Sequence, residues 1–206
     1  RLSAAARTAC ELDAVISVCR ACPRLVAWRE EVARTGRRAS FAHEPYWGRP
    51  APSTGDPDAP ILIVGLAPAA NGANRTGLMF TGDRSGDWLW SALHRAGMAR
   101  RECSTATGDG QALLTARMGA TVRCAPPANK PTAEERSTCS AYLVREIELM
   151  KNLKVFLALG GIAWNATLSA VKAAGWRVPR PKPRFGHGAE ATVASHDGRD
   201  VTLLGC

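Results

Sequence analysis

The sequence predicts an α/β protein, a three-layer α/β/α sandwich built around a central, mostly parallel β-sheet. Short apolar runs typical of buried strands occur at residues 61–64, within 113–122, at 155–159 and at 201–204. Segments with helical patterns separate these runs, and such alternation favours parallel strands joined by helices. The chain has 206 residues, enough for one domain with a core, so we expect residues 1–206 to form a single domain.

The expected helices are marked by their spacing and their caps. Behind residues 82–83, apolar side chains recur at helical spacing, namely Trp88, Leu89, Leu93 and Ala96. Thr132 and Glu135 have the spacing of a capping box, in which each side chain binds the other residue's backbone N–H at a helix start. A third helix is expected over 161–174, closed by Gly175.

The net charge of the chain indicates which classes of binding partner to expect. The formal net charge is +9, with 27 Lys and Arg residues against 18 Asp and Glu residues. This excess favours polyanionic partners, nucleic acid above all, although charge alone is equally consistent with a soluble basic protein. The densest basic run is 177–184. No apolar run is long enough to predict a membrane span, and residues 1–15 read as an amphipathic helix rather than a signal peptide, so we expect a cytoplasmic protein.

The seven cysteines are an odd number, which disfavours a disulfide framework and favours metal or cluster ligation. Two of them form a C-x-x-C motif within an N-terminal segment, 1–44, and two distant ones could join them: Cys19, Cys22, Cys124 and Cys139. Iron–sulfur clusters and structural zinc both use such sets, and spacing does not choose between them. Scattered buried cysteines and a redox-active C-x-x-C are the alternatives. The other three are expected to be free thiols: Cys10, Cys103 and Cys206.

The loop after the first apolar run is the first place to look for a site, because open α/β sheets bind ligands beyond the carboxyl ends of their strands. Residues 65–83, GLAPAANGANRTGLMFTGD, contain four glycines, which let backbone approach a ligand closely. Phe80 stands among small and polar residues, so its ring either stacks on a base or folds back into the core. Asp83 ends the loop at the expected helix N-terminus, where a capping and a catalytic role are compatible.

Five segments together closely resemble the iron–sulfur uracil-DNA glycosylases, and within them family 5, the B-type enzymes of bacteria and archaea. The segments are 19–32 (CRACPRLVAWREEV), 44–50 (EPYWGRP), 65–83, 122–135 (VRCAPPANKPTAEE) and 158–164 (ALGGIAW). They occur in the family's order and span most of the chain. The motif GLAP separates this branch from family 4, whose members carry an acidic residue at the position of Leu66.

The resemblance implies a glycosylase that removes uracil and other deaminated bases, such as hypoxanthine, from DNA by hydrolysing the N-glycosidic bond. It implies a structural [4Fe–4S] cluster held by Cys19, Cys22, Cys124 and Cys139. It also implies that Phe80 stacks on the extruded base, that Asp83 acts on water and that Asn129 faces the reaction centre.

The remaining site residues are expected from their position in or beside the loop. The backbone of the strand end is expected to bind the base, through Gly65, Leu66 and Ala67. Arg75 and Arg84 are candidate DNA contacts, although solvated surface charge is an equally good reading of either. We expect the partner to be DNA, single- or double-stranded, and the protein to act as a monomer in the bacterial nucleoid.

Two departures from the family pattern qualify these expectations. Leu78 stands where the family usually has Arg, so a basic contact is lost. The family's second motif, with a functional histidine, should follow residue 206, and without it binding or catalysis should be impaired. The rival readings are a glycosylase that crosslinks to the abasic sugar, a non-catalytic DNA-damage binder and a zinc-stapled nucleic-acid-binding module.

Overall fold

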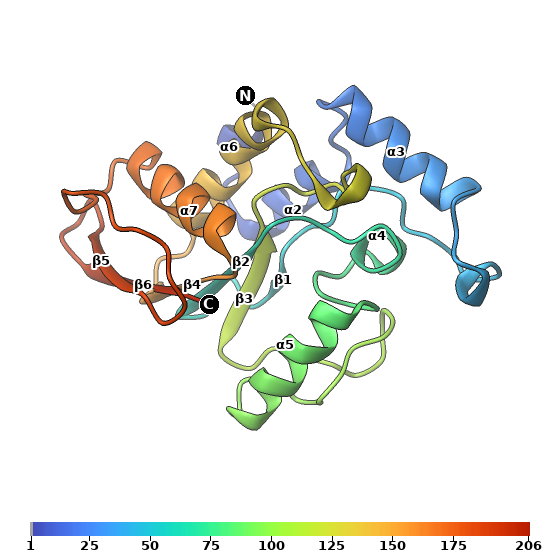
Figure 1. Ribbon diagram of the computed structural model, residues 1–206. Helices are drawn as coiled ribbons and strands as arrows, with labels where there is room; N and C mark the ends of the chain where they lie inside the picture. Colours follow the sequence, from blue (N-terminus) through green and yellow to red (C-terminus); the bar gives the residue numbers. More distant parts are fainter. Residues whose placement is uncertain (1) are drawn as a thin grey trace.

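The structure is a computed structural model that describes residues 2–206, and a six-stranded β-sheet forms its centre (Figure 1). Across the sheet the strands follow the order β1-β3-β2-β4-β6-β5. Their bounds are β1 Thr54–Gly55, β2 Ile61–Gly65, β3 Ala116–Ala120, β4 Val155–Ala158, β5 Glu190–Ala194 and β6 Asp200–Gly205. The four inner strands are parallel, and β1 and β5 pair antiparallel at the two edges. The expected mostly parallel sheet is therefore confirmed.

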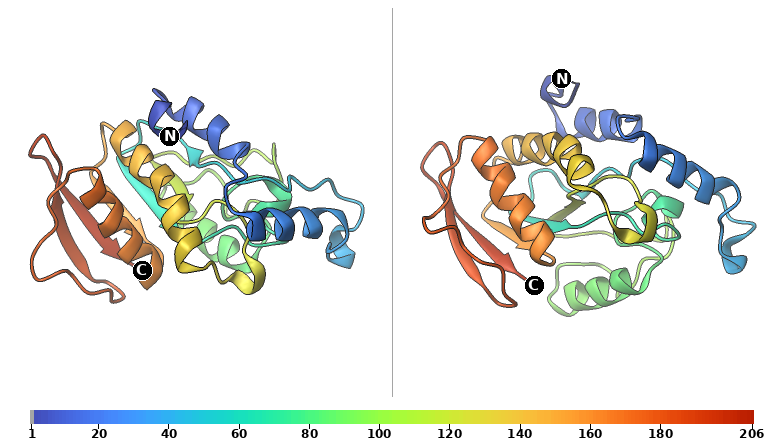
Figure 2. Two further views of the ribbon diagram at one scale, coloured as in Figure 1. Left: turned by 90° about the horizontal axis from the view of Figure 1, so that it is seen from above. Right: turned by 45° about the horizontal axis from the view of Figure 1, so that its top comes forward.

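Helices cover both faces of this sheet, which confirms the three-layer arrangement (Figure 2). Their bounds are α1 Leu2–Ala5, α2 Ala9–Ser17, α3 Pro23–Arg34, α4 Ala73–Thr76, α5 Arg84–Arg95, α6 Ala133–Leu149 and α7 Gly161–Ala173, with short 3-10 helices at η1 Ala39–Phe41 and η2 Pro127–Asn129. No helix among residues 2–206 has the length and apolar character needed to cross a lipid bilayer.

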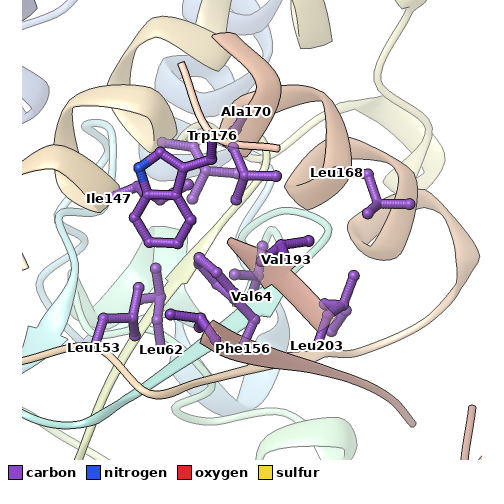
Figure 3. Close-up of a cluster of buried hydrophobic side chains, with 14 of the residues drawn as sticks. Leu62, Val64, Ile147, Leu153, Phe156, Leu168, Ala170, Trp176, Val193 and Leu203 are labelled. Atoms are coloured by element: carbon purple, nitrogen blue, oxygen red, sulfur yellow. The ribbon is translucent and has the colours of Figure 1, made fainter. Parts of the chain in front are cut away.

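The two faces of the sheet carry separate apolar cores. Along β2, Leu62 and Val64 point into the core that includes residues of α6 and α7, whereas Ile63 points into the core beneath α5. This alternation follows from the two-residue period of a strand. In the first core the ring of Phe156 packs against Trp176, with ring centroids 5.9 Å apart (Figure 3). Both faces of the central strands are thus buried, as parallel sheets require.

The three helix signals of the sequence are confirmed. Asp83 is the N-cap of α5, and its side chain accepts a hydrogen bond from the Gly86 N–H. Both hydrogen bonds of the expected capping box are present at the start of α6. Gly175 follows α7 with a φ of 81°, a left-handed conformation that glycine adopts without steric cost.

Both edge strands and α3 give no clear signal in the sequence. β1 has two residues inside the Pro- and Gly-rich stretch 45–60, and β5 has no continuous apolar run, because only alternate side chains are buried. The helix α3 is polar over most of its surface, and what it buries includes a charged side chain, that of Arg29. Edge strands need to bury only one face, so they lack the run of apolar residues that marks a central strand.

A buried ionic network joins α2, β3 and α6. The carboxylate of Glu146 accepts a hydrogen bond from Arg117 Nε at 2.8 Å and one from Arg123 Nη2 at 2.5 Å. Arg117 Nη2 also donates to Asp13 of α2 at 2.7 Å, and Arg123 Nη1 donates to the Ser53 hydroxyl at 2.5 Å. The side chains of Glu146 and both arginines are almost fully buried, so each charge depends on its partners.

The network shifts the pKa values of its two carboxyl groups in opposite directions. Burial would raise the pKa of Glu146, but the charges of Arg123 and Arg117 outweigh it, and the pKa lies below its usual range. For Asp13 burial prevails over Arg117, and the pKa is raised. Because the pKa of Glu146 is lowered on folding, its stabilisation is present above the unfolded pKa of about 4.3 and is lost as the pH falls through the folded pKa.

Glu146→Gln leaves Arg117 and Arg123 buried with a neutral amide between them. We expect the free energy of unfolding at pH 7 to fall by about 3–5 kcal/mol, the usual cost of breaking a buried ion pair from one side. Urea denaturation measures this. The matched control is Glu148→Gln, which removes a carboxylate paired with Arg145 at a half-exposed site and should change the stability by less than about 1 kcal/mol. Equal losses in both variants would contradict the bracing role of the network.

Candidate active site

A pocket of about 500 Å³ opens where the parallel strands end. Gly65 closes β2 and Ala120 closes β3, while Leu159 and Cys206 directly follow β4 and β6; all four line the pocket. In the sheet, β3 lies on one side of β2 and β4 lies on the other. The order of the strands therefore reverses at β2. Open α/β sheets bind ligands at such a reversal.

The pocket is lined by residues from four separate segments of the chain: 65–92, 120–129, Leu159 and Cys206. Six of the residues expected to form the site line it: Gly65, Leu66, Ala67, Phe80, Asp83 and Asn129. The loop 65–83 supplies eight of the sixteen lining residues, α5 supplies four, and Asn129 comes from η2 after β3. The turn after β2 is fixed by β3, because the carbonyl oxygens of Gly65 and Leu66 accept hydrogen bonds from the Thr121 and Val122 N–H groups at 2.9 Å each.

The ring of Phe80 lies directly against the backbone of Gly65. A Cβ atom on residue 65 would stand 2.5 Å from the Phe80 Cζ atom, so only glycine permits this contact. Phe80 itself has a φ of +56°, and its carbonyl oxygen accepts a hydrogen bond from Trp90 Nε1 at 2.8 Å. The ring is partly buried against the core beneath α5 and also lines the pocket, so the two alternatives for Phe80 are combined in one position.

One carboxylate oxygen of Asp83 accepts a backbone hydrogen bond, and the other lies close to Gly72. Its Oδ1 atom accepts a hydrogen bond from the Gly86 N–H at 3.0 Å, which caps α5. Its Oδ2 atom approaches Gly72 so closely that a Cβ there would stand 2.5 Å away. The cap therefore fixes the carboxylate at the pocket wall, and the capping and site-forming positions coincide.

Backbone strain is concentrated beside this pocket. Among residues 2–206, the non-glycine residues with positive φ are Phe80, Ala128 and Asn129, at 56°, 51° and 55°. Phe80 and Asn129 line the pocket, and Ala128 adjoins it. A non-glycine residue in this region costs of the order of 1–3 kcal/mol and persists only where the surroundings hold it. The side chain of Asn129 is exposed, so its amide is available to a ligand.

The two arginines expected to bind DNA have different surroundings. Arg84 is exposed at the first position of α5, between Asp83 and Ser85 of the pocket. Arg75 is 6% exposed and does not line the pocket. Its guanidinium pairs with Glu44, donates to the carbonyl oxygens of Asn71 and Thr105, and lies 4.1 Å from the ring centroid of Phe41. We therefore assign Arg75 to holding the loop and omit it from the DNA-binding surface.

Trp88 is a pocket residue that the sequence does not single out. The helical repeat groups it with apolar neighbours, but in α5 it is Trp90 and Leu93 that are buried, and Trp88 is 67% exposed at the pocket wall. Trp88 lies four residues after Arg84, so the two side chains share one side of the helix. A tryptophan beside an arginine close to the capped end of α5 is the signal that could have identified it.

The four cysteines expected to hold a cluster line a second cavity, of about 510 Å³. They are Cys19 after α2, Cys22 at the N-cap of α3, Cys124 after β3 and Cys139 in α6. The other walls are largely apolar. Within residues 2–206, no three His, Cys, Asp or Glu side chains converge on the position of a single metal ion.

Buried donors face the sulfur atoms of this cavity. Arg29 Nη1 donates to Cys124 Sγ at 2.9 Å, and the Arg123 backbone N–H donates to Cys139 Sγ at 3.3 Å. The Nε atom of Arg29 is buried without a hydrogen-bond partner among the described residues. Burial raises the pKa of Cys124 to about 11 and that of Cys139 to about 12. A buried cation beside four sulfurs suits a ligand that binds them as thiolates, because coordination deprotonates the thiols.

The fold and the pocket define an α/β protein whose candidate site lies beyond the carboxyl ends of its parallel strands. The family model of the uracil DNA glycosylase superfamily matches residues 52–197. The chain belongs to this superfamily. Curated relatives named type-5 uracil-DNA glycosylase are similar over the whole chain: that of Mycobacterium tuberculosis is 54% identical over 206 residues, 74% of its own length, and that of Mycobacterium leprae is 52% identical over 206 residues, 86% of its length. The Thermus thermophilus protein of the same name is 51% identical over 154 residues, which are 75% of this chain and 69% of the relative.

Gly65→Ala should displace the ring of Phe80 without unfolding the protein, since the clash is with the end of a side chain. We expect uracil release from DNA to fall roughly tenfold or more, in keeping with base–aromatic stacking worth ~1–3 kcal/mol. Activity assays measure this loss, and a crystal structure shows where the ring goes. Gly161→Ala is the control, because its Cβ would meet Phe185 at an ordinary 3.4 Å. A Gly65→Ala variant with full activity and an unmoved ring would contradict the close contact.

Proposed function

We propose that this protein removes uracil from DNA by hydrolysing the N-glycosidic bond, and that the pocket around Phe80 and Asp83 performs the reaction. The observation that carries the proposal is that an aromatic ring, a capped carboxylate and an exposed amide line one strand-end pocket. Membership of the uracil DNA glycosylase superfamily supports the choice of reaction and of DNA as substrate.

The position of the pocket requires the target base to leave the DNA double helix. A base inside a duplex cannot reach a pocket formed by the ends of a sheet, so the nucleotide is turned out of the stack. Unstacking costs a few kcal/mol and least for a mispaired base, which favours a uracil opposite guanine. In the pocket the ring of Phe80 offers a flat surface for the base, and its contact with Gly65 fixes the plane of that surface.

Asp83 is the group we assign to the sugar. Breaking the glycosidic bond leaves positive charge on the sugar, and a carboxylate fixed beside it stabilises that charge. The Oδ1 atom is engaged by the Gly86 N–H, so Oδ2 is the atom that orients the attacking water and takes its proton. Holding the carboxylate through a helix cap avoids the reorganisation that a mobile side chain would need.

Asn129 and the turn after β2 are assigned to the departing base. Negative charge builds on the base as the bond breaks, and an amide N–H donor beside it stabilises that charge. The wall from Leu66 to Ala69 carries small or apolar side chains, with few polar groups to discriminate one base edge from another. Base selectivity is therefore loose, and deaminated purines such as hypoxanthine belong to the proposed substrates.

The rim beside α5 is assigned to the DNA backbone and the flanking bases. Arg84 is exposed there and supplies a cation for a phosphate. Trp88 is exposed on the same side of the helix and supplies a ring next to the pocket. We further propose that the protein acts as a monomer in the bacterial cytoplasm, where the DNA lies.

We propose that Cys19, Cys22, Cys124 and Cys139 hold a [4Fe–4S] cluster as thiolates. The four thiols line one largely apolar cavity of about 510 Å³, and a four-iron cluster binds through four thiolates. Arg29 supplies a buried positive charge that offsets the charge of the thiolates. Bound there, the cluster would act as a structural brace, and no step of the reaction depends on it. Its ligands come from α3, α6 and two loops, so it ties the N-terminal segment to the sheet.

Asp83→Asn should abolish most activity and leave the fold intact. The asparagine oxygen can still accept the Gly86 N–H and cap α5, so the melting temperature should stay close to that of the unsubstituted protein. Uracil release from duplex DNA, scored as alkali-labile abasic sites, should fall roughly 10²–10⁴-fold, as expected for loss of a positioned proton acceptor.

The control for this variant is Asp87→Asn, which removes a carboxylate from the first turn of the same helix, outside the pocket lining. It should keep full activity. Equal activity of Asp83→Asn and the unsubstituted protein would overturn the assignment of Asp83. A stable covalent adduct between protein and abasic DNA would favour the crosslinking reading, and binding to damaged DNA without base release would favour the non-catalytic one.

The purified protein should be brown, with absorbance near 400 nm and about four irons per chain, as a four-thiolate cluster requires. Cys124→Ser should lose iron, lose this absorbance and melt at lower temperature. The matched control is Cys103→Ser, which changes an exposed free thiol and should keep all three properties. A colourless protein that contains one zinc ion would contradict the cluster.

A further inference from the structure

A basic groove of about 690 Å³ lies outside the active-site pocket, between α3 and the segment 46–49. Five of the twelve residues that line it are arginines, and one is acidic: Arg20, Arg29, Arg34, Arg37, Arg49 and Glu30. None of these residues lines the pocket that contains Phe80 and Asp83. No role is given to this groove by the proposed reaction.

The arginines differ in how strongly they are engaged. Arg20 is paired with Glu30 and Arg34 with Glu31, both as exposed ion pairs. Such pairs contribute little, so either arginine can exchange its partner for a phosphate. Arg29 is buried against Cys124. Arg49 is exposed and has no hydrogen-bonded or ionic partner among the residues that the structure describes.

Two aromatic rings present the remaining guanidinium groups. Arg49 lies 5.5 Å from the ring centroid of Trp47, and Arg37 lies 5.1 Å from that of Tyr46. Stacking on a ring fixes the plane of a guanidinium. Arg37 already donates to backbone carbonyls, those of Ala33, Ala42 and Glu44, so Arg49 is the stacked arginine whose N–H edge is available to a phosphate. The rings themselves are anchored, because Trp47 Nε1 donates to the Pro50 carbonyl at 3.0 Å and Tyr46 donates its hydroxyl to Asn71 at 2.6 Å.

The wall of the groove is also the support of the catalytic loop. The Trp47 N–H donates to the Arg75 carbonyl at 2.8 Å, and the Gly48 N–H donates to the Asn74 carbonyl at 2.9 Å. Both acceptors belong to α4, which leads into the segment with Phe80 and Asp83. The ring of Trp47 packs on Gly77, where a Cβ would stand 3.1 Å away. In Figure 1, α3 and α4 accordingly lie side by side, at the opposite end of the molecule from β5.

We propose that this groove binds the sugar–phosphate backbone of the DNA substrate at nucleotides flanking the excised base, with Arg34 and Arg49 as phosphate contacts. The helix α4 lies between α5, which borders the pocket, and α3, which borders the groove, so a strand leaving the pocket across α4 would reach the groove (Figure 1). The inference rests on the proposed function for the identity of the ligand, but the groove's affinity for DNA is independent of base excision. This face of the protein would position the DNA without reading its sequence, because phosphate contacts carry no sequence information.

The test measures binding of uracil-free duplex DNA at several salt concentrations. The double variant Arg34→Gln/Arg49→Gln should bind roughly tenfold more weakly, and the slope of log affinity against log salt should decrease by roughly 0.9 for each phosphate contact removed. Arg49→Lys keeps the charge and should retain most of that slope. The control is Arg95→Gln/Arg100→Gln, which removes the same charge from exposed arginines outside both the groove and the pocket.

The outcomes separate this inference from the proposed function. Excision of uracil from a single-stranded oligonucleotide too short to extend past α4 into the groove should be equal in the groove variant and the unsubstituted protein, because that substrate contacts the pocket alone. If the groove variant and the control bind duplex DNA with the same affinity and salt slope, the groove does not contact DNA and the inference is wrong. If the unsubstituted protein binds DNA through the groove but excises no uracil, the proposed function fails and the groove stands.

Discussion

The carboxylate of Glu146 is shared by two buried arginines, and this contact holds the N-terminal part of the chain against the sheet. Arg117 belongs to β3 and continues the network to Asp13 of α2. Arg123 lies just after β3 and directly precedes Cys124, so the same contact also sets the position of a cavity-lining thiol. Two charges buried on one carboxylate tolerate little movement, because any loss of contact leaves a charge without compensation.

The rest of the site follows from how parallel strands end together. Because β2, β3, β4 and β6 point the same way, their carboxyl ends form one edge, and the loops that leave this edge enclose the pocket. The loop 65–83 folds back over its own strand until Phe80 rests on Gly65, and α5 then starts at Asp83. The loop thereby places an aromatic ring and a carboxylate near Gly65, the residue at which the loop begins.

The sequence predicts most of the architecture because its signals are local. Apolar runs mark the four central strands, and the Thr132 capping box marks α6. The expected pocket residues meet because a strand, its loop and the next helix are contiguous in the chain. The exceptions depend on contacts between distant segments: Arg75 is buried by Glu44 and Phe41, and the exposure of Trp88 depends on which side of α5 meets the sheet. The residues adjacent in sequence determine neither whether a side chain is buried nor which way it points.

The left-handed backbone at Phe80, Ala128 and Asn129 has a consequence for how this protein can change. Glycine at Ala128 or Asn129 would relax the local conformation and stabilise the chain, whereas glycine in place of Phe80 would also remove a ring that packs against the core. Two of the three would then lose the side chains that line the pocket, and the third would loosen the turn that presents an amide. Substitutions that raise stability at this edge of the sheet would therefore lower catalytic activity. A more stable variant that keeps its activity must carry its stabilising substitutions elsewhere in the molecule.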